Sequence, residues 1–379
     1  MRKNPMLAIF TTVFIDLLGF GILIPVFPLL ITDGPFRVTP DGWSFTQGMI
    51  MLGWLQAIYP FCMFIAAPIL GQLSDRHGRR PVLALSIFGT AIGYVLFAIG
   101  ISTGNLPLLF AARGLDGMTG GNLAVAQAAI GDISTHENRA KNFGYMGAAF
   151  GMGFIVGPYL GGKLSSPSVS FYGLFDTPHW FGATTPFWFA AILALLNCTA
   201  VLTTFPETIK EKFHGGKIRV GQSLNNVVNG FKSDRLRVIL ISSFLFSAGF
   251  TFFTTFFGVY LRNKFSFSSS KIGDYFAIVG LCIALSQGLV VGRVAKKLVD
   301  FKVLKFSMFG TGAMMLIYFL TPTTSSMYLY MVIPFFAIFN GLCMANTSSL
   351  ISRSAEMGKQ GEAMGIYASV SSLSQVPAA

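Results

Sequence analysis

Long apolar stretches, separated by short polar segments, follow one another along nearly the whole chain. Ten of them have about 20 residues or more, the length with which an α-helix crosses the hydrocarbon core of a bilayer. They cover residues 6–31, 47–71, 81–100, 106–130, 143–163, 185–205, 237–261, 272–292, 303–321 and 326–350. An eleventh begins near Ala363 and runs to Ala379. The pattern predicts an all-α polytopic membrane protein, because the short alternating segments of a membrane β-barrel do not occur.

The composition excludes the soluble classes of protein. Only 11% of the 379 residues are charged, whereas soluble domains have about 25%, so a cytosolic enzyme or a disordered scaffold could not cover its surface. The four cysteines lie inside apolar stretches without zinc-binding spacing, which predicts neither a disulfide framework nor a metal site. Because no Walker A pattern and no nucleophile–base pair occurs, we expect no enzyme, no ATP-driven pump and no cofactor.

Lysine and arginine residues predict how the chain is oriented in the membrane. With a cytoplasmic N-terminus, 21 of the 27 Lys and Arg residues lie in cytoplasmic segments, 5 lie on the opposite side, and Arg113 stays within a span. Because basic loops face the cytoplasm, we predict this orientation, in a bacterial inner membrane. The net charge of +12 is dispersed over six loops, which fits anionic lipid heads and argues against nucleic acid as a partner.

The parts of the chain on either side of the longest polar segment look related. Gly71 and Gly292 each open a basic segment and lie 221 residues apart, and Gly121 and Gly341 lie 220 residues apart in corresponding helices. Parallel repeats of six helices, with substrate bound between them, are a known transporter architecture. We therefore predict an N-terminal bundle over 1–205, a cytoplasmic linker over 206–236 and a C-terminal bundle over 237–379. An offset of about 220 residues also predicts a twelfth helix, so that the sequence stops within helix 11; coincidence between apolar segments is the alternative.

The polar segment between the second and third predicted helices has a distinctive sequence. From Gly71 to Pro81 it reads Gly-Gln-Leu-Ser-Asp-Arg-His-Gly-Arg-Arg-Pro, which resembles motif A of the major facilitator superfamily. The resemblance implies that Asp75 faces the positive N-terminus of helix 11 and that Arg79 pairs with Asp132 at the end of helix 4. Simple anchoring of a basic loop is the alternative. The residues assigned to this gate are Gly71, Asp75, Arg76, Gly78, Arg79, Arg80 and Asp132.

Glycines recur every fourth position in the fifth predicted helix. This smooth stripe resembles motif C, which is associated with antiporters, and its gating residues are Gly153, Gly157, Pro158 and Gly161. Small residues recur with the same spacing from Gly280 to Gly292 in the eighth helix, so we predict that the two stripes pack together. Ordinary packing of small residues is the alternative.

The fourth predicted helix contains a charged residue deep in the apolar region. The run from Arg113 to Gly121 resembles motif B, and a charge at this depth costs about 2.5–3.5 kcal/mol on insertion scales. Arg113 is therefore expected to face a hydrated cavity with an acidic partner, either Asp116 one turn away or Asp16 in helix 1. A static ion pair that joins helices 1 and 4 is the alternative. The run from Asp16 to Pro28 resembles the first-helix signature of twelve-helix drug–proton antiporters.

Among these antiporters, the chain is most similar to the tetracycline/proton group, as in the stretches 131–134 and 149–154. That group carries acids near the positions of Gly93 and Phe309, neither of which is acidic here, while Asp116 is an additional acid. These departures argue against tetracycline itself as the substrate. The resemblance implies a monomer with the two-bundle fold of the major facilitator superfamily.

Proton coupling is expected at Asp16, Asp116 and Arg113. Burial favours the neutral form of a carboxyl group and a nearby guanidinium favours the charged form, so rocking of the two bundles would change the proton affinity. All four histidines lie in loops, which argues against a histidine relay. We therefore predict proton-coupled efflux of an amphiphilic organic compound by alternating access. An importer or lipid-like flippase of the same fold, and a membrane receptor or scaffold without transport, are the alternatives.

Polar side chains within the spans, among many aromatic residues, predict a midplane site for the substrate. Its candidate residues are Gln56, Tyr59, Gln127, Tyr145, Phe253, Gln287 and Asn340. The alternative is that the aromatic side chains face lipid and the polar ones bond across helices.

Overall fold

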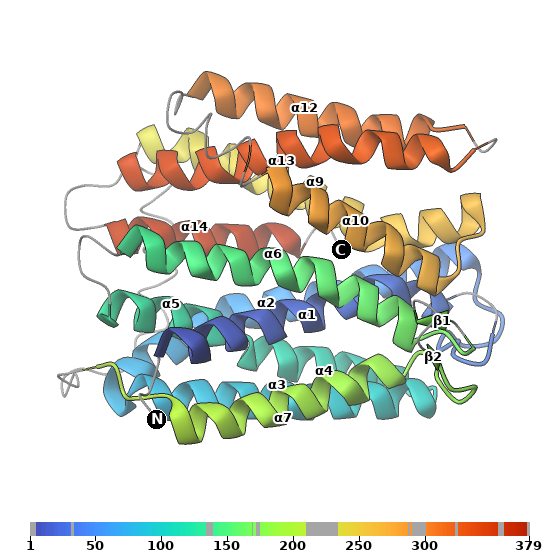
Figure 1. Ribbon diagram of the computed structural model, residues 1–379, viewed down its shortest axis with the longest axis horizontal. Coiled ribbons are helices and arrows are strands. Elements are labelled where there is room, and N and C mark those ends of the chain that lie inside the picture. Colours follow the sequence, from blue (N-terminus) through green and yellow to red (C-terminus); the bar gives the residue numbers. More distant parts are fainter. Residues whose placement is uncertain are drawn as a thin grey trace.

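The computed structural model describes residues 5–31, 34–133, 139–168, 170–171, 175–209, 234–286, 289, 301–322, 325–354 and 360–376 (Figure 1). Its elements are α1 (Pro5–Ile31), α2 (Phe45–His77), α3 (Arg79–Ser102), α4 (Leu106–Thr119), α5 (Asn122–Ile133), α6 (Arg139–Leu164), β1 (Ser170–Phe171), β2 (Phe175–Asp176), α7 (Thr185–Thr204), α9 (Asp234–Phe265), α10 (Ser269–Ser286), α12 (Phe301–Leu320), α13 (Met327–Ser354) and α14 (Gln360–Gln375). The two strands form a small antiparallel hairpin with Ser170 opposite Asp176. Within the described ranges, eight helices are long and apolar enough to cross a membrane. The predicted all-α membrane architecture is confirmed.

The fourth predicted helix is not continuous. We predicted one helix over 106–130, whereas α4 ends at Thr119 and α5 begins at Asn122. The break falls on Gly120 and Gly121, where α2 comes very close. A Cβ added to Gly120 would lie 2.7 Å from the Tyr59 hydroxyl oxygen, and one added to Gly121 would lie 3.0 Å from the Ala67 Cα. Glycine permits this approach but weakens a helix interior, which accounts for the break.

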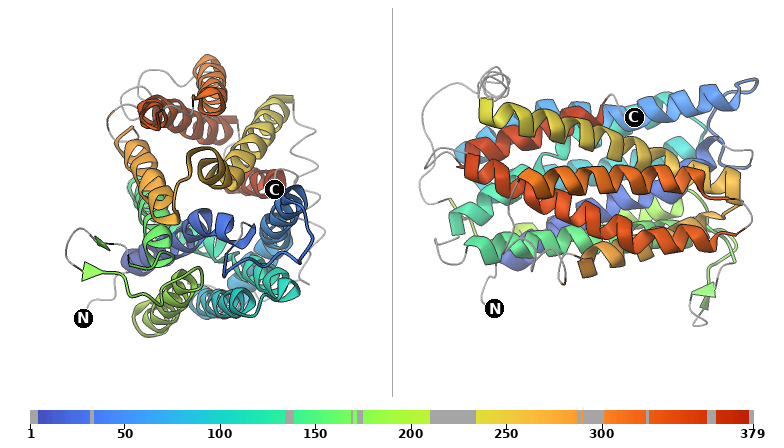
Figure 2. Two further views of the ribbon diagram at one scale, coloured as in Figure 1. Left: turned by 90° about the vertical axis from the view of Figure 1, so that its right-hand side faces the viewer. Right: turned by 90° about the horizontal axis from the view of Figure 1, so that it is seen from above.

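The helices form two groups, which the end-on view in Figure 2 separates. In the first group, α1 to α7, α1 packs along α6, and α3 packs between α4 and α7. In the second group, α9 to α14, α12 packs on α13, and α14 lies along α9. The largest buried apolar cluster belongs to the first group apart from Val259 on α9, and the next largest belongs to the second group apart from Ile24 on α1. The predicted linker falls largely on 210–233, outside the described residues.

The glycine stripe of α6 has a different partner from the one we predicted. Its three glycines lie against α1, where added Cβ atoms would come within 2.5 Å of Leu17, 2.7 Å of Leu18 and 2.7 Å of Ile22. The α10 helix does pack on α6, as predicted, with Gly273 beside Gly162 and Gly280 against Ile155. The predicted pairing of the two helices is confirmed, but α10 meets another face of α6 than the stripe; Gly288 and Gly292 lie outside the described residues. Regular spacing shows that another helix approaches closely, but it does not show which helix.

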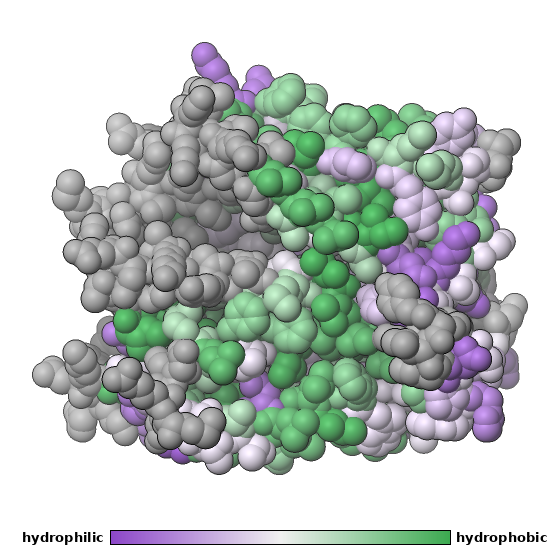
Figure 3. Space-filling view, in the orientation of Figure 1, coloured by the Kyte–Doolittle hydropathy of each residue, from purple (hydrophilic) through white to green (hydrophobic). Residues whose placement is uncertain are grey.

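Large apolar side chains cover the outer surface of the helices. Leu245, Phe309 and Leu320 are 65%, 75% and 80% exposed, and Figure 3 shows a broad hydrophobic band across the described part of this face. Such a surface is stable against lipid tails and unfavourable in water. Many aromatic residues of the spans therefore face lipid.

Candidate functional site

A buried cluster of charged and polar groups lies where α4 meets α2. Arg113 is 3% exposed, and its Nη1 donates to Oδ2 of Asp116 at 3.1 Å. The guanidinium carbon stands 4.5 Å from the centre of the Tyr59 ring, and Nη2 lies 3.5 Å from Oε1 of Gln56. One helical turn separates the members of each pair, so each helix presents two groups to the same place. The guanidinium is held by an anion, an aromatic face and an amide.

Asp16 of α1 faces this cluster across a very small cavity. The cavity measures about 10 Å³ and is lined by Asp16, Tyr59, Arg113 and Asp116, with Thr90 and Tyr94 of α3. This is room for about one water molecule. Asp16 forms no ion pair with any described residue. The structure thus brings together all three residues that we predicted for proton coupling, with one acid paired and the other separated by the cavity.

Sequence reasoning missed three neighbours of these acids. Thr90 and Tyr94 lie one turn apart on α3 and line the cavity, and Asn122 is fully buried beside Asp16, at the first position after the helix break. The signal for the two α3 residues was present in the sequence, because Thr90 and Tyr94 share one face with the small Gly93 between them. Asn122 follows a glycine pair whose disruption of the helix was not foreseen.

Gly93 explains one departure from the tetracycline group. The resemblance expects an acid near this position of α3, yet a Cβ added to Gly93 would lie 3.2 Å from the Cβ of Asp116. The carboxyl group of Asp116 therefore occupies the space beside α3 from the facing helix α4. The second departure, Phe309, is directed outward and is 75% exposed.

The predicted gate segment forms a network at the end of the molecule that carries the N-terminus (Figure 1). Arg79 is buried, and its Nε donates to Oδ2 of Asp132 at 2.9 Å, while Nη1 pairs with Asp75 at 2.6 Å and also donates to Ser74. The contact between Arg79 and Asp132 is the one that the resemblance implied. Asp75 pairs with this same arginine; the side chains at the start of α14, its other expected neighbour, lie outside the described residues.

Glu207 completes this network from the segment after α7, and the sequence did not point to it. Its carboxylate accepts from the backbone N–H of Arg79 at 2.8 Å and of Arg80 at 3.3 Å, at the N-terminus of α3. A negative charge there is stabilised by the helix dipole and by the unpaired N–H groups. Gly78 precedes the helix with φ +104°, and an added Cβ would lie 2.8 Å from the Glu207 Cδ. Gly78 is thus needed for both conformation and space.

The predicted substrate residues do not form one site. Gln56 and Tyr59 belong to the charged cluster, while Phe253 packs on Phe257, Tyr318 and Phe336 in the core of the second group. Asn340 is 1% exposed and is not part of the charged cluster. The side chains of Gln127 and Tyr145, and Gln287 as a whole, lie outside the described residues.

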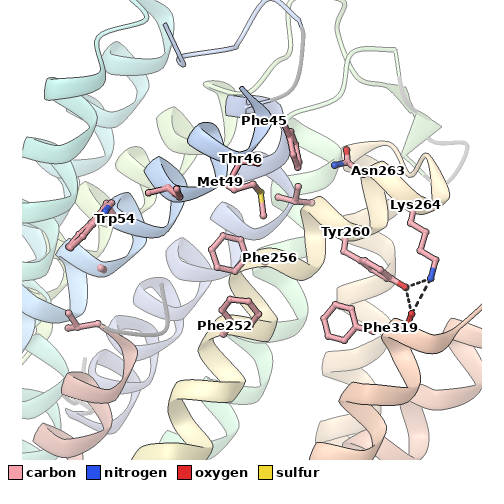
Figure 4. A pocket seen from close by; sticks show the side chains of 14 residues that line it. Phe45, Thr46, Met49, Trp54, Phe252, Phe256, Tyr260, Asn263, Lys264 and Phe319 are labelled. Atoms are coloured by element: carbon pink, nitrogen blue, oxygen red, sulfur yellow. Dashed lines mark hydrogen bonds between the residues drawn. The ribbon is translucent and has the colours of Figure 1, made fainter. Parts of the chain in front are cut away.

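A wide apolar groove of about 720 Å³ runs between α2 and α9 (Figure 4). Phe252 and Phe256, neighbours of Phe253, line it, and Lys264 at one end donates to the Tyr260 hydroxyl and to the Phe319 carbonyl. Val376, directly after α14, also borders the groove. None of the predicted substrate residues that the structure describes lines this groove, so we do not assign it to a substrate.

Comparisons with known proteins agree with this geometry. The family model described as Major Facilitator Superfamily matches residues 9–379. The Tetracycline resistance protein, class C, of Escherichia coli is 30% identical over 99% of this chain and 87% of its own, and the class B protein of the same organism is 33% identical over 78% and 68%. The crystal structure of the human organic anion transporter MFSD10 (TETRAN) superposes with a TM-score of 0.72 at 21% identity, over 98% of this chain and 91% of its own. The chain therefore belongs to the Major Facilitator Superfamily, whose members are multi-pass membrane transporters and not enzymes.

Proposed function

We propose that the protein exports an amphiphilic organic compound in exchange for protons, by alternating access. The observation that carries this proposal is the buried pair of Arg113 and Asp116, with Asp16 across a cavity of one water molecule. Its closest structural alternative, a static ion pair between helices, does not account for a second acid that has no ion-pair partner in the described part of the chain. The proposal assigns proton coupling to these three residues.

The charge of the cluster explains how a proton could control the protein. With both acids ionised, one guanidinium and two carboxylates give a net charge of −1; one bound proton makes the cluster neutral. An unpaired charge in a low-dielectric interior costs several kcal/mol. Conformations that enclose the cluster therefore favour the protonated form, and conformations that hydrate it favour proton release. A change of conformation and a change of protonation are in this way linked.

The proposal also requires that the two bundles move relative to each other. At the hairpin end, close to β1 and β2, the helix groups touch through Gly162 and Gly273 and through the ion pair of Lys163 with Asp274. At the opposite end lies the Arg79 network. Alternating access requires contacts at one end to open while those at the other form. We propose that the bundles 1–205 and 237–379 move in this way, with the N-terminus in the cytoplasm of a bacterial inner membrane.

The substrate class rests on the relatives and on the surroundings of the cluster. The two bacterial relatives are named for resistance to tetracycline, an organic amphiphile. Gln56 and Tyr59 stand directly beside Arg113, where they would sense a change in its pairing. We propose that they link substrate binding to the proton site, and that the remaining candidates line the path between the bundles.

Drug-driven proton flux tests this function. Purified protein in liposomes with a pH-sensitive dye inside is exposed to tetracycline or ethidium, and proton movement is followed together with uptake of the compound. We expect opposite movement of proton and compound in the wild type, loss of both in Asp16→Asn and Asp116→Asn, and no change in the control Asp176→Asn, which lies exposed in the hairpin. Movement in the same direction would identify a symporting importer, and full activity of both variants would overturn the coupling assignment.

A further inference from the structure

We propose that Tyr94 carries the proton path between Asp16 and Asp116, acting with one water molecule in the cavity that they share. This inference rests on the proposed proton coupling and adds a residue and a route to it. Tyr94 is 5% exposed, and it lines the small polar cavity together with Asp16 and Asp116. A hydroxyl beside such a cavity can hydrogen-bond to a water molecule held there.

Gly19 shows where the hydroxyl of Tyr94 lies. A Cβ added to Gly19 would sit 1.6 Å from the Tyr94 hydroxyl oxygen and 2.5 Å from its Cζ, so the end of the tyrosine fills the space that a side chain on α1 would take. Gly19 follows Asp16 by three residues and therefore lies on the same face, one turn along the helix. The hydroxyl thus reaches α1 beside the acid of that helix.

The other end of Tyr94 is anchored beside the second acid. Tyr94 follows Gly93, whose backbone lies against Asp116 closely enough that an added Cβ would be 3.2 Å from the Cβ of that residue. The tyrosine therefore extends from the neighbourhood of Asp116 on α4 to the neighbourhood of Asp16 on α1. Both acids, Tyr59 and Arg113 are close enough to act electrostatically on its hydroxyl.

Two small cavities border Tyr94, and they differ in how well they can hold a water molecule. The cavity of about 10 Å³ that contains Asp16 is polar, with two acids, a guanidinium and two tyrosines in its wall. A second cavity of about 10 Å³ also borders Tyr94, Arg113 and Asp116, but the rest of its wall is apolar: Leu23, Gly93, Phe97, Ala112 and Phe187. Small apolar cavities stay dry. The polar cavity that joins the two acids is therefore the better site for the water molecule.

The transfer itself needs no other reactant. The carboxylic acid of Asp16 releases its proton to the oxygen of Tyr94, while the hydroxyl proton of Tyr94 passes to the cavity water, which releases one of its own protons to the carboxylate of Asp116. One O–H bond breaks and one forms at the tyrosine, which stays neutral. Asp16 loses one proton and Asp116 gains one, and the same steps in reverse return the proton to Asp16. Tyr59 is less suited to this step, because its ring lies under Arg113 and its hydroxyl lies against Gly120.

Tyr94→Phe tests the route, because it removes the hydroxyl and keeps the ring. In liposomes, tetracycline-driven or ethidium-driven proton flux is expected to fall by about 10²-fold or more, in the range of a lost proton-transfer group. Counterflow of the labelled compound at equal pH needs no net proton transfer and should remain within about twofold of wild type. Tyr275→Phe is the matched control, because Tyr275 is equally buried in the second helix group. Proton flux that stays at the wild-type level in Tyr94→Phe would overturn the proposal, as would an equal loss of flux and counterflow.

Two further measurements test the proton route independently of the proposed transport function. Infrared difference spectra of the solubilised protein, with carboxyl bands assigned by Asp16→Asn and Asp116→Asn, need no transport. The Asp16 C=O band should move to higher wavenumber in Tyr94→Phe, because the proposed hydrogen bonding of Asp16 with the hydroxyl and the cavity water is lost. Gly19→Ala should give the same band shift by displacing the hydroxyl. An unchanged band in both variants would overturn the route even in an active transporter. A wild type without drug-driven flux would overturn the proposed function and leave the band shift as the test of the contact.

Discussion

Lys163 on α6 and Asp274 on α10 form an ion pair across the two helix groups, with 3.0 Å between Nζ and Oδ2. Lys163 also donates to the Ser270 hydroxyl at 2.9 Å and is 9% exposed. Next to it, the backbones of Gly162 and Gly273 touch: an added Cβ on either would lie within 3.0 Å of the other's Cα. The charged pair therefore sits beside a close backbone contact between the groups, and we expect opening of the hairpin end to separate it.

Lys163→Met is expected to favour opening at the hairpin end. Because Asp274 is partly exposed, we expect the pair to contribute about 1 kcal/mol, or about a fivefold change in the open population. Ser269→Cys, introduced at a buried position of the same contact, reports opening through its rate of reaction with a membrane-impermeant maleimide. The control is Lys271→Met, since Lys271 is exposed and rests on the Phe267 ring. A labelling rate that Lys163→Met leaves unchanged would show that the pair does not hold this end closed.

Glu207 is expected to stabilise the N-terminus of α3 by its charge and by its hydrogen bonds. Glu207→Ala should lower the free energy of unfolding by about 1 kcal/mol, the usual effect of removing a helix cap. Glu207→Gln keeps an acceptor oxygen but not the charge and should lose less. Thermal unfolding in detergent, with Asp41→Ala as an exposed control, measures both. Equal stability of Glu207→Ala and wild type would contradict the role of the cap.

The ion pair of Arg113 and Asp116 predicts strong non-additivity. Arg113→Ala leaves a buried carboxylate without its partner and should cost about 3–5 kcal/mol, whereas the double variant Arg113→Ala/Asp116→Ala should regain most of that stability. Transport should be lost in both. Thermal stability of the two single variants and the double variant gives the coupling energy. Additive losses would mean that the two side chains do not stabilise each other in the folded protein.

The glycines of α6 allow a test of the corrected helix partner. Gly157→Ala places a methyl group 2.7 Å from the Leu18 carbonyl oxygen and should push α1 away, at a cost of about 1–3 kcal/mol. Gly151→Ala is the matched control in the same helix, because nothing lies within 4 Å of its added Cβ. Cysteine cross-linking between α1 and α6, together with thermal unfolding, reports the change. Equal behaviour of the two variants would place the contact elsewhere.

Hydrophobic length was enough to predict the helices, since crossing a bilayer imposes that length on each segment. It was not enough for the break at Gly120 and Gly121, because the cause is the approach of α2, which is distant in the sequence. The sequence placed two acids, Asp116 and Asp16, within reach of Arg113, and the structure selects Asp116 as the ion-pair partner. The role of Glu207 could not follow from spacing, because Arg79 and Glu207 are 128 residues apart.

The candidate site was predictable in its charges and less so in its neutral parts. A buried charge needs a partner, so Arg113, Asp116 and Asp16 are visible in the sequence of an apolar chain. A tyrosine within a span can face lipid, pack in a core or line a cavity, and its sequence position does not decide between these. The position of Tyr94 depends on two glycines on different helices: Gly19 leaves room for its hydroxyl, and Gly93 lets α3 approach Asp116. Phe253 illustrates the opposite outcome, since it is buried in a core and its two neighbours line the groove.

The central claim is that protonation of the Asp16, Arg113 and Asp116 cluster is coupled to movement of an organic compound. The most direct test imposes a pH gradient on liposomes that contain the purified protein and counts protons and tetracycline or ethidium molecules in the same sample. We predict opposite fluxes in a fixed ratio in the wild type, and no gradient-driven flux of the compound in Asp116→Asn or Asp16→Asn although both remain folded. Accumulation of the compound against its gradient in either variant, with the wild-type ratio of protons, would contradict the account.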